Sequence, residues 1–170
     1  MRYCYECGTL LEDRYLEDEG IIPFCKKCNT FRFPVFSTAV SMIVLAPEKD
    51  RILLIQQYGT GNNVLVAGYI NCGESAEAAV IREVAEEIGL KVTSMHFNKS
   101  EYFKKSNTLM LNYTCTVDSD SLDGLNKKEV DKAQWFSVKD AADNIMQNSL
   151  AQRFLLNYLN NNERGEEYQK

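Results

Sequence analysis

Residues 68–90 read GYINCGESAEAAVIREVAEEIGL, and the later part of this stretch has the pattern of an amphipathic helix. Ser75 is a candidate N-cap, and Gly89 stands where a left-handed residue commonly follows the end of a helix. Between them, apolar side chains recur at helical spacing and predict one buried stripe: Val80, Ile81, Val84 and Ile88. The sequence therefore predicts a helix between Ser75 and Gly89.

One face of this predicted helix carries the carboxylates of Glu83, Glu86 and Glu87, at positions i, i+3 and i+4. Like charges at this spacing repel, so the cluster does not serve helix stability. A solvated acidic face is the structural alternative. Oxygen-only ligands suit a hard cation such as Mg²⁺, which is commonly shared with substrate phosphates. The cluster favours a divalent-cation site.

The full stretch resembles the Nudix box, G-x5-E-x7-R-E-U-x-E-E-x-G-U, where U is a bulky aliphatic residue. Gly68, Glu74 and residues 82–90 match it at every specified position. The resemblance implies the Nudix fold, an α/β/α sandwich with a mixed β-sheet. It also implies attack of water on a diphosphate linked to a nucleoside, with Mg²⁺ or Mn²⁺ as the catalytic cation.

Cysteines dominate the first thirty residues as two Cys-x-x-Cys pairs: Cys4 with Cys7, and Cys25 with Cys28. Two such pairs at this separation are typical of a four-thiolate zinc site. Disulfides and a redox motif are the competing interpretations. Four protein ligands leave no open coordination position, so the zinc is expected to be structural. We predict a zinc ribbon over residues 1–33.

The composition is that of a compact protein: 170 residues, 25% charged, with a formal net charge of −5. The negative charge argues against nucleic acid or an anionic membrane surface as the main partner. No apolar run is long enough to cross a bilayer, and the first residues contain no secretory apolar segment. We expect a cytoplasmic protein that binds a small nucleotide.

The rest of the chain reads as one catalytic domain over residues 34–160, followed by a flexible tail over 161–170. Apolar and alternating patterns predict strands near residues 38–45, 51–57, 64–67, 108–117 and 134–136. Helices are expected to begin at Ser137 and to cover residues 149–159. His96, the sole histidine, is assigned to a polar turn after the box.

A zinc ribbon directly before a Nudix domain is similar to the bacterial NADH pyrophosphatases, and so is the run Ala67-Gly68-Tyr69-Ile70. The resemblance implies an NAD(H)-like substrate, a homodimer, and a Tyr69 that stacks on a base; a core tyrosine is the alternative. The family marker S-Q-P-W-P-F-P-x-S corresponds to SEYFKKSNT at residues 100–108, with Phe103 as its aromatic. Since the prolines and tryptophan are replaced, ADP-ribose, nucleotide sugars or another diphosphate remain alternatives. A non-catalytic nucleotide-binding regulator is a further one.

The resemblance also implies roles for individual residues. Residues 128–136 resemble the E-x3-A-x-W-F segment of Nudix proteins, whose glutamate, here Glu129, reaches the metal site; an exposed loop glutamate is the alternative. Glu87 or Glu129 activates the attacking water. Arg82 is expected to face away from the metal and to orient the other glutamates through Glu74. The implied metal ligands are Glu83, Glu86, Glu87, Glu129 and the carbonyl of Gly68.

Overall fold

The computed structural model describes residues 2–163. The chain divides into two compact units, residues 1–36 and 37–170, each described separately below. We expected the first unit to end at residue 33. The last helix continues to Glu163, three residues into the predicted tail, and residues 164–170 of that tail lie outside the described residues.

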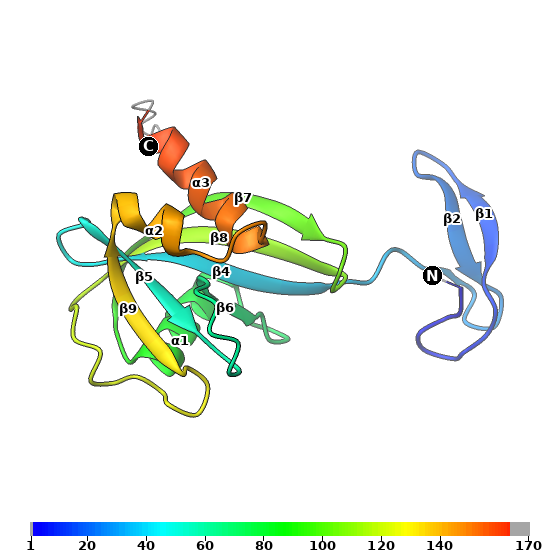
Figure 1. Ribbon diagram of the computed structural model, residues 1–170. Coiled ribbons are helices and arrows are strands. Elements are labelled where there is room, and N and C mark those ends of the chain that lie inside the picture. Colours follow the sequence, from blue (N-terminus) through cyan, green and yellow to red (C-terminus); the bar gives the residue numbers. More distant parts are fainter. Residues whose placement is uncertain (1, 164–170) are drawn as a thin grey trace. The chain divides into compact units, whose positions relative to one another are not determined.

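The first unit is a small antiparallel sheet of strands β1 (Glu12–Leu16), β2 (Gly20–Cys25) and β3 (Thr30–Phe31), in that order (Figure 1). Its strands are short, and Phe24 and Cys25 are their buried residues, so the sheet buries few apolar side chains. Such a unit depends on a crosslink or a bound metal for stability. Cys25 lies at the end of β2, next to the other cysteines.

The second unit is built on a six-stranded mixed sheet in the order β7-β8-β4-β5-β9, with β6 paired to β4 (Figure 1). Strands β4 and β8 run parallel, and the other pairs are antiparallel. The strands are β4 (Ser37–Leu45), β5 (Arg51–Gln56), β6 (Val66–Tyr69), β7 (Val92–Phe103), β8 (Thr108–Val117) and β9 (Lys132–Ser137).

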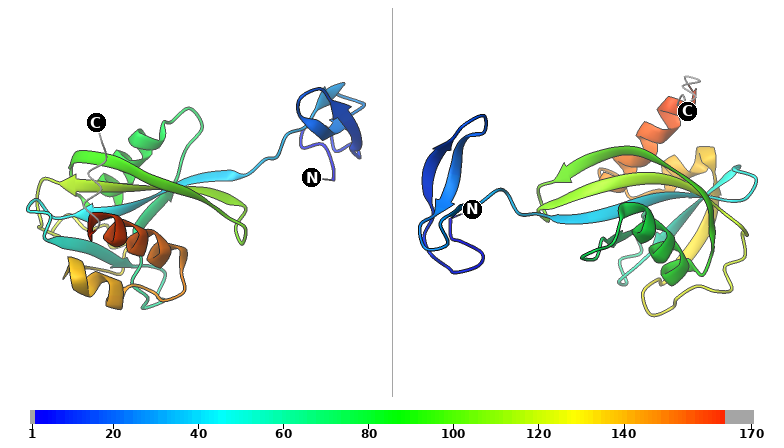
Figure 2. Two further views of the ribbon diagram at one scale, coloured as in Figure 1. Left: turned by 90° about the horizontal axis from the view of Figure 1, so that it is seen from above. Right: turned by 180° about the vertical axis from the view of Figure 1, so that it is seen from behind.

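Helices cover both faces of this sheet (Figure 2). Helix α1 (Ala76–Ile88) packs on one face, while α2 (Val138–Asn144) and α3 (Leu150–Glu163) pack on the other. The apolar run from Met42 to Leu45 in β4 follows from this layering. Met42 and Val44 join the core under α1, whereas Ile43 and Leu45 join the core under α2 and α3. The predicted α/β/α sandwich with a mixed sheet is confirmed.

Helix α1 begins and ends as the sequence predicts. The Ser75 hydroxyl accepts a hydrogen bond from the Ala78 amide at 3.1 Å, and Gly89 adopts a left-handed φ of 70°. The predicted burial of Ile81 was wrong, because 48% of it is exposed. The buried face follows Val80, Val84 and Ile88 at a spacing of four residues, and Ile81 is turned about 100° from it.

Strand β7 was missed by the sequence analysis, and the assignment of His96 to a turn was wrong, since it lies within this strand. β7 is an edge strand with mostly polar side chains, and its pairing with β8 shifts register between Val92 and Ser94 and between Phe97 and Lys99. These shifts break the alternation of polar and apolar residues that identifies a strand. Among the described helices, none is long and apolar enough to span a membrane.

Candidate active site and cysteine cluster

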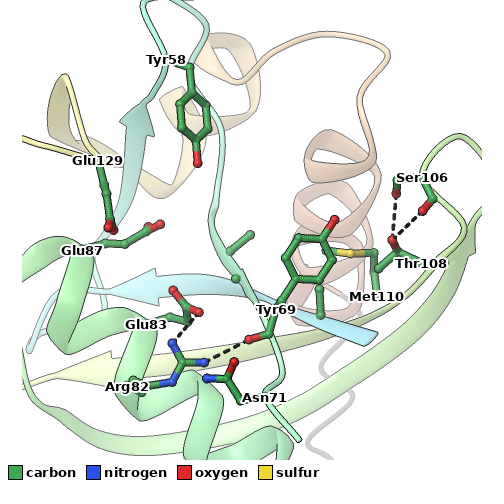
Figure 3. A pocket seen from close by; sticks show the side chains of 13 residues that line it. Tyr58, Tyr69, Asn71, Arg82, Glu83, Glu87, Ser106, Thr108, Met110 and Glu129 are labelled. Atoms are coloured by element: carbon green, nitrogen blue, oxygen red, sulfur yellow. Dashed lines mark hydrogen bonds and ion pairs between the residues drawn. The ribbon is translucent and has the colours of Figure 1, made fainter. Parts of the chain in front are cut away.

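A cavity of ≈ 470 Å³ lies between α1, β6 and the loop before β9 (Figure 3). Six of the sequence-predicted site residues line it: Gly68, Tyr69, Arg82, Glu83, Glu87 and Glu129. Glu86 and Phe103 do not line it; Glu86 is more than half exposed, and Phe103 ends strand β7. The structure thus brings most of the predicted site together from distant parts of the chain.

Glu87 is the most buried carboxylate of the cavity, with only 4% of the residue exposed. Its Oε1 accepts a hydrogen bond from Gln57 Nε2 at 2.8 Å, whereas its Oε2 is buried without a hydrogen-bond partner. Burial is the main reason that the pKa of Glu87 rises to about 7. The negative charges of the neighbouring glutamates raise this pKa further: Glu83, Glu129 and Glu86.

An unpartnered buried carboxylate oxygen among other carboxylates is costly unless a positive charge neutralises it. An all-oxygen donor set of this kind fits a hard divalent cation. Within the part of the chain that the structure describes, the cysteines form the one group of potential ligands whose atoms all lie within 4.8 Å of one another. The glutamates of the described residues form no such group, so their oxygens are spread around the cavity.

Arg82 connects the carboxylates of this region. Its Nε and Nη2 donate to the two oxygens of Glu74 at 2.7 and 2.9 Å, and the guanidinium lowers the pKa of Glu74 to about 2. Its Nη1 also donates to Glu83 at 2.7 Å and to Glu86 at 3.0 Å. Arg82 therefore reaches these two glutamates directly and lines the cavity, rather than facing away from it.

The close approach of Glu83 to β6 explains the glycine at position 68. A Cβ atom built on Gly68 would lie 1.9 Å from the Cδ atom of Glu83, far inside van der Waals contact. Only a residue without a side chain leaves room for the carboxylate against the strand. Gly68 itself is held in the sheet by its pairing with Val40.

Glu129 reaches the cavity from the loop between β8 and β9, which three contacts hold in place. Val130 is fully buried, the Asp131 amide donates to the Gln56 carbonyl at 2.8 Å, and the Asn126 amide donates to the Glu87 carbonyl at 3.0 Å. A loop anchored on both sides of Glu129 places this exposed residue at the wall of the cavity.

Two tyrosines extend into the cavity (Figure 3). Tyr69 is 58% exposed, so the alternative of a core tyrosine is wrong. Tyr58, which sequence reasoning did not single out, is 83% exposed and lines the same cavity from the turn after β5. The sequence of this turn, residues 58–61, does not indicate that Tyr58 lines a cavity, because the turn meets the other lining residues only in the folded chain. Further lining comes from Ser106, Thr108 and Met110 near the start of β8.

The four cysteine side chains of the first unit form a compact cluster. The Sγ atoms of Cys4 and Cys28 lie 3.9 Å apart, and those of Cys7 and Cys25 lie 3.5 Å apart. A tetrahedral zinc with Zn–S bonds of about 2.3 Å requires sulfur separations of about 3.8 Å. These distances exceed an S–S bond of about 2.05 Å, so the cysteines are free thiols placed to hold a metal ion.

The turns after the two pairs have matching backbone geometry. Gly8 follows Cys7 with a φ of 69°, and Asn29 follows Cys28 with a φ of 52°. The Cys28 amide donates to the Cys25 sulfur at 3.4 Å, as expected of a knuckle that stabilises a thiolate. This local geometry, set by residue spacing and turn residues, explains why the cluster could be predicted from sequence.

An α/β/α sandwich in which helix α1 presents carboxylates to a cavity defines the structural class of this chain. The NUDIX domain family matches residues 35–157, and the chain belongs to the Nudix family. The resemblance inferred from the box is confirmed.

Relatives and solved structures agree with this assignment. The chain is 31% identical over 160 residues to the protein named NAD-capped RNA hydrolase NudC from Pseudomonas aeruginosa, covering 93% of this chain and 55% of that protein. It is 29% identical to the protein of the same name from Vibrio parahaemolyticus, covering 82% and 52%. The chain spans about half the length of the curated relatives it matches.

The fold is similar to a Nudix hydrolase from Nitrosomonas europaea, with a TM-score of 0.64 and 19% identity over 97% of this chain and 94% of that one. It is also similar to an ADP compounds hydrolase, with a TM-score of 0.62 and 18% identity over 91% and 93%. At these identities, the two structures support the fold alone.

Proposed function

We propose that this chain hydrolyses the diphosphate bond of a nucleoside-diphosphate-linked compound, with NAD(H)-like dinucleotides as the preferred substrates. The observation that carries the proposal is the buried, unpartnered Oε2 of Glu87 in a cavity that also contains Glu83, Glu129 and two exposed tyrosines. Carboxylates for a cation and aromatic surfaces for a ring are the two elements that such a substrate requires. The names of the relatives, which include NAD, support this choice.

Glu83 and Glu87 are the residues that would hold Mg²⁺ or Mn²⁺, with Glu86 and the Gly68 carbonyl beside them. When bound, the cation would neutralise the carboxylates and polarise phosphoryl oxygens. Arg82 orients Glu83 and Glu86 through its hydrogen bonds. We assign activation of water to Glu129, because Glu87 already uses one oxygen for Gln57. Water attacks phosphorus, its proton passes to Glu129, and the bridging P–O bond breaks to leave two phosphate monoesters.

Replacing Glu129 by glutamine tests this division of roles. The variant is expected to lose about 10²- to 10⁴-fold in kcat, because an amide cannot accept the proton. Its affinity for Mn²⁺ should remain close to that of the wild type, as measured by electron paramagnetic resonance. If Glu129→Gln keeps its turnover, Glu87 is the base and the assignment of Glu129 is wrong.

Gly68→Ala is expected to abolish most of the activity without unfolding the domain. The added methyl group must push the Glu83 carboxylate away from β6. A displacement of about 1 Å in a catalytic group costs about a hundredfold in rate. Steady-state turnover beside a circular dichroism melt checks this, and wild-type turnover in a folded variant would show that the position of Glu83 is unimportant.

Tyr69 and Phe103 are the two aromatic residues that the family resemblance offers for stacking on the substrate, and Tyr69 is the one of the two that lines the cavity. Tyr69→Ala should raise KM about five- to a hundredfold, equivalent to roughly 1–3 kcal/mol of lost stacking. Phe103→Ala should have a smaller effect, because Phe103 does not line the cavity. Equal KM values for wild type and Tyr69→Ala would exclude Tyr69 from the substrate site.

A substrate panel tests the proposed function. NADH, NAD⁺, ADP-ribose, diadenosine polyphosphates and nucleoside triphosphates are incubated with Mg²⁺, and product monophosphates are separated by chromatography. We expect NADH or NAD⁺ to give the highest kcat/KM. If ADP-ribose or another diphosphate exceeds them by more than about a hundredfold, the dinucleotide preference fails while the hydrolase class stands. Absence of hydrolysis of every compound would favour a nucleotide-binding regulator.

For the first unit we propose a structural zinc ion bound by Cys4, Cys7, Cys25 and Cys28, since their sulfur spacing fits tetrahedral zinc. We also propose a homodimer, as the resemblance to the NADH pyrophosphatases implies, and a cytoplasmic location. The net charge of −5 supports a small nucleotide rather than a nucleic acid as the main partner. Light scattering coupled to size exclusion measures the mass and decides between monomer and dimer.

A further inference from the structure

A second cavity of ≈ 320 Å³ adjoins the first, and Tyr58 belongs to the walls of both. Valine and methionine side chains give it apolar surface, and a few polar groups lie among them. Cavities of this character suit a ring system that offers a small number of hydrogen-bonding atoms. The proposed mechanism leaves this cavity without a role. Its lining residues are Gln57, Tyr58, Thr60, Asn62, Val64 and Met146.

Neither burial nor backbone preference explains a tyrosine at position 58. With 83% of the residue exposed, Tyr58 adds little to the core. Its φ of 56° lies in the left-handed region, which a residue with a large side chain adopts at an energetic cost. Conformations of this kind gather at ligand-binding positions, where the surrounding structure holds them in place.

The turn that carries Tyr58 is fixed to the loop that carries Glu129. The Gly59 amide donates to Asp131 Oδ2 at 2.7 Å, and the Asp131 amide donates to the Gln56 carbonyl at 2.8 Å. Figure 3 shows Tyr58 extending toward the cavity on the same side as Glu87 and Glu129, with Tyr69 across from them. The tyrosine is therefore held at a defined place beside the carboxylates.

Gln57 joins the second cavity to the predicted cation site. Its side chain lines the second cavity while its Nε2 donates to Glu87 Oε1 at 2.8 Å. The two cavities therefore share Tyr58, and Gln57 connects the second cavity to Glu87, the most buried carboxylate of the first. With its diphosphate at Glu87, a substrate would have Tyr69 on one side and Tyr58 on the other.

We propose that the second cavity binds the second ring system of a two-ring diphosphate substrate, with Tyr58 as the wall shared by both arms. The inference rests on the proposed hydrolase function and assigns a binding site to the second arm of its dinucleotide substrate. Dinucleotides, with a base or nicotinamide ring on each side of the diphosphate, would use both cavities. ADP-ribose, which has a base on one side of the diphosphate and only a ribose on the other, would leave the second cavity without a base.

Filling the second cavity tests the proposal. Thr60 lies on an exposed turn, so Thr60→Trp places a large side chain at the cavity and outside the core; it also removes the hydrogen bonds of the Thr60 hydroxyl with the Gln57 carbonyl and the Asn62 amide. Hydrolysis of NADH and of ADP-ribose with Mg²⁺ is measured for wild type, Thr60→Trp and the matched control Glu48→Trp, whose exposed turn lines neither cavity. The ratio of kcat/KM for NADH to that for ADP-ribose should fall at least about tenfold in Thr60→Trp, and it should not change in Glu48→Trp.

Tyr58→Ala should lower the same ratio of kcat/KM values. Tyr58→Phe should keep the wild-type ratio, because the aromatic ring rather than the hydroxyl forms the wall between the two cavities. If wild type cleaves both compounds and Thr60→Trp leaves the ratio unchanged in a folded protein, the second cavity holds no substrate ring and the inference fails alone. If wild type cleaves neither compound nor any other diphosphate, the proposed function fails and this inference falls with it.

Discussion

Replacing Glu87 by glutamine is expected to lower kcat by about 10²- to 10³-fold, the range observed when one charge-stabilising group is removed from an active site. The amide has the shape of the carboxylate but cannot neutralise a divalent cation. Thermal stability should stay the same or rise slightly, since the substitution removes a buried negative charge among other carboxylates. A large loss of kcat without a loss of thermal stability distinguishes a functional residue from a structural one.

Turnover with saturating Mg²⁺ and a thermal melt in EDTA measure these effects. The control is Glu48→Gln, which removes an exposed carboxylate from the turn between β4 and β5. Near-normal turnover of Glu87→Gln, on a substrate that the wild type hydrolyses, would mean that this cavity is not the catalytic site.

Replacing Cys25 by serine should release the zinc and unfold the first unit, because the small sheet has few buried apolar contacts apart from the cysteine cluster. The wild-type protein is expected to contain about one zinc per chain. The second unit has its own two apolar cores and should remain folded. Elemental analysis and limited proteolysis with mass mapping check both parts.

The matched control for this prediction is Cys72→Ser, because Cys72 is exposed and lies outside the cluster. It should keep the zinc content of the wild type. A wild-type protein without zinc, or with disulfides after reduction and repurification, would contradict the zinc-ribbon account.

Local chemistry explains what could be predicted from the sequence. The limits of α1 depend on Ser75 and Gly89, which act on neighbouring backbone groups. The cysteine cluster likewise depends on two short spacings and on the turns beside them. Strand β4 was recognisable because both faces of its later part are buried, which gives the apolar run from Met42 to Leu45.

Long-range contacts explain what was missed. The place of Tyr58 depends on the hydrogen bond between Gly59 and Asp131, which are 72 positions apart. Strand β7 is identified by its pairing with β8, while its own residues are polar and its register is broken by bulges. The direct contacts of Arg82 with Glu83 and Glu86 depend on rotamers that residue spacing does not determine.

On the proposed function, the carboxylates of α1 hold a divalent cation in the cavity. Titration of Mn²⁺ into the 170-residue chain, followed by electron paramagnetic resonance, tests this directly because bound and free Mn²⁺ are distinguished. The account predicts binding to the wild type that Mg²⁺ displaces, and at least about tenfold weaker binding to Glu87→Gln. Equal Mn²⁺ affinity in wild type and Glu87→Gln, or no Mn²⁺ binding by the wild type, would contradict it.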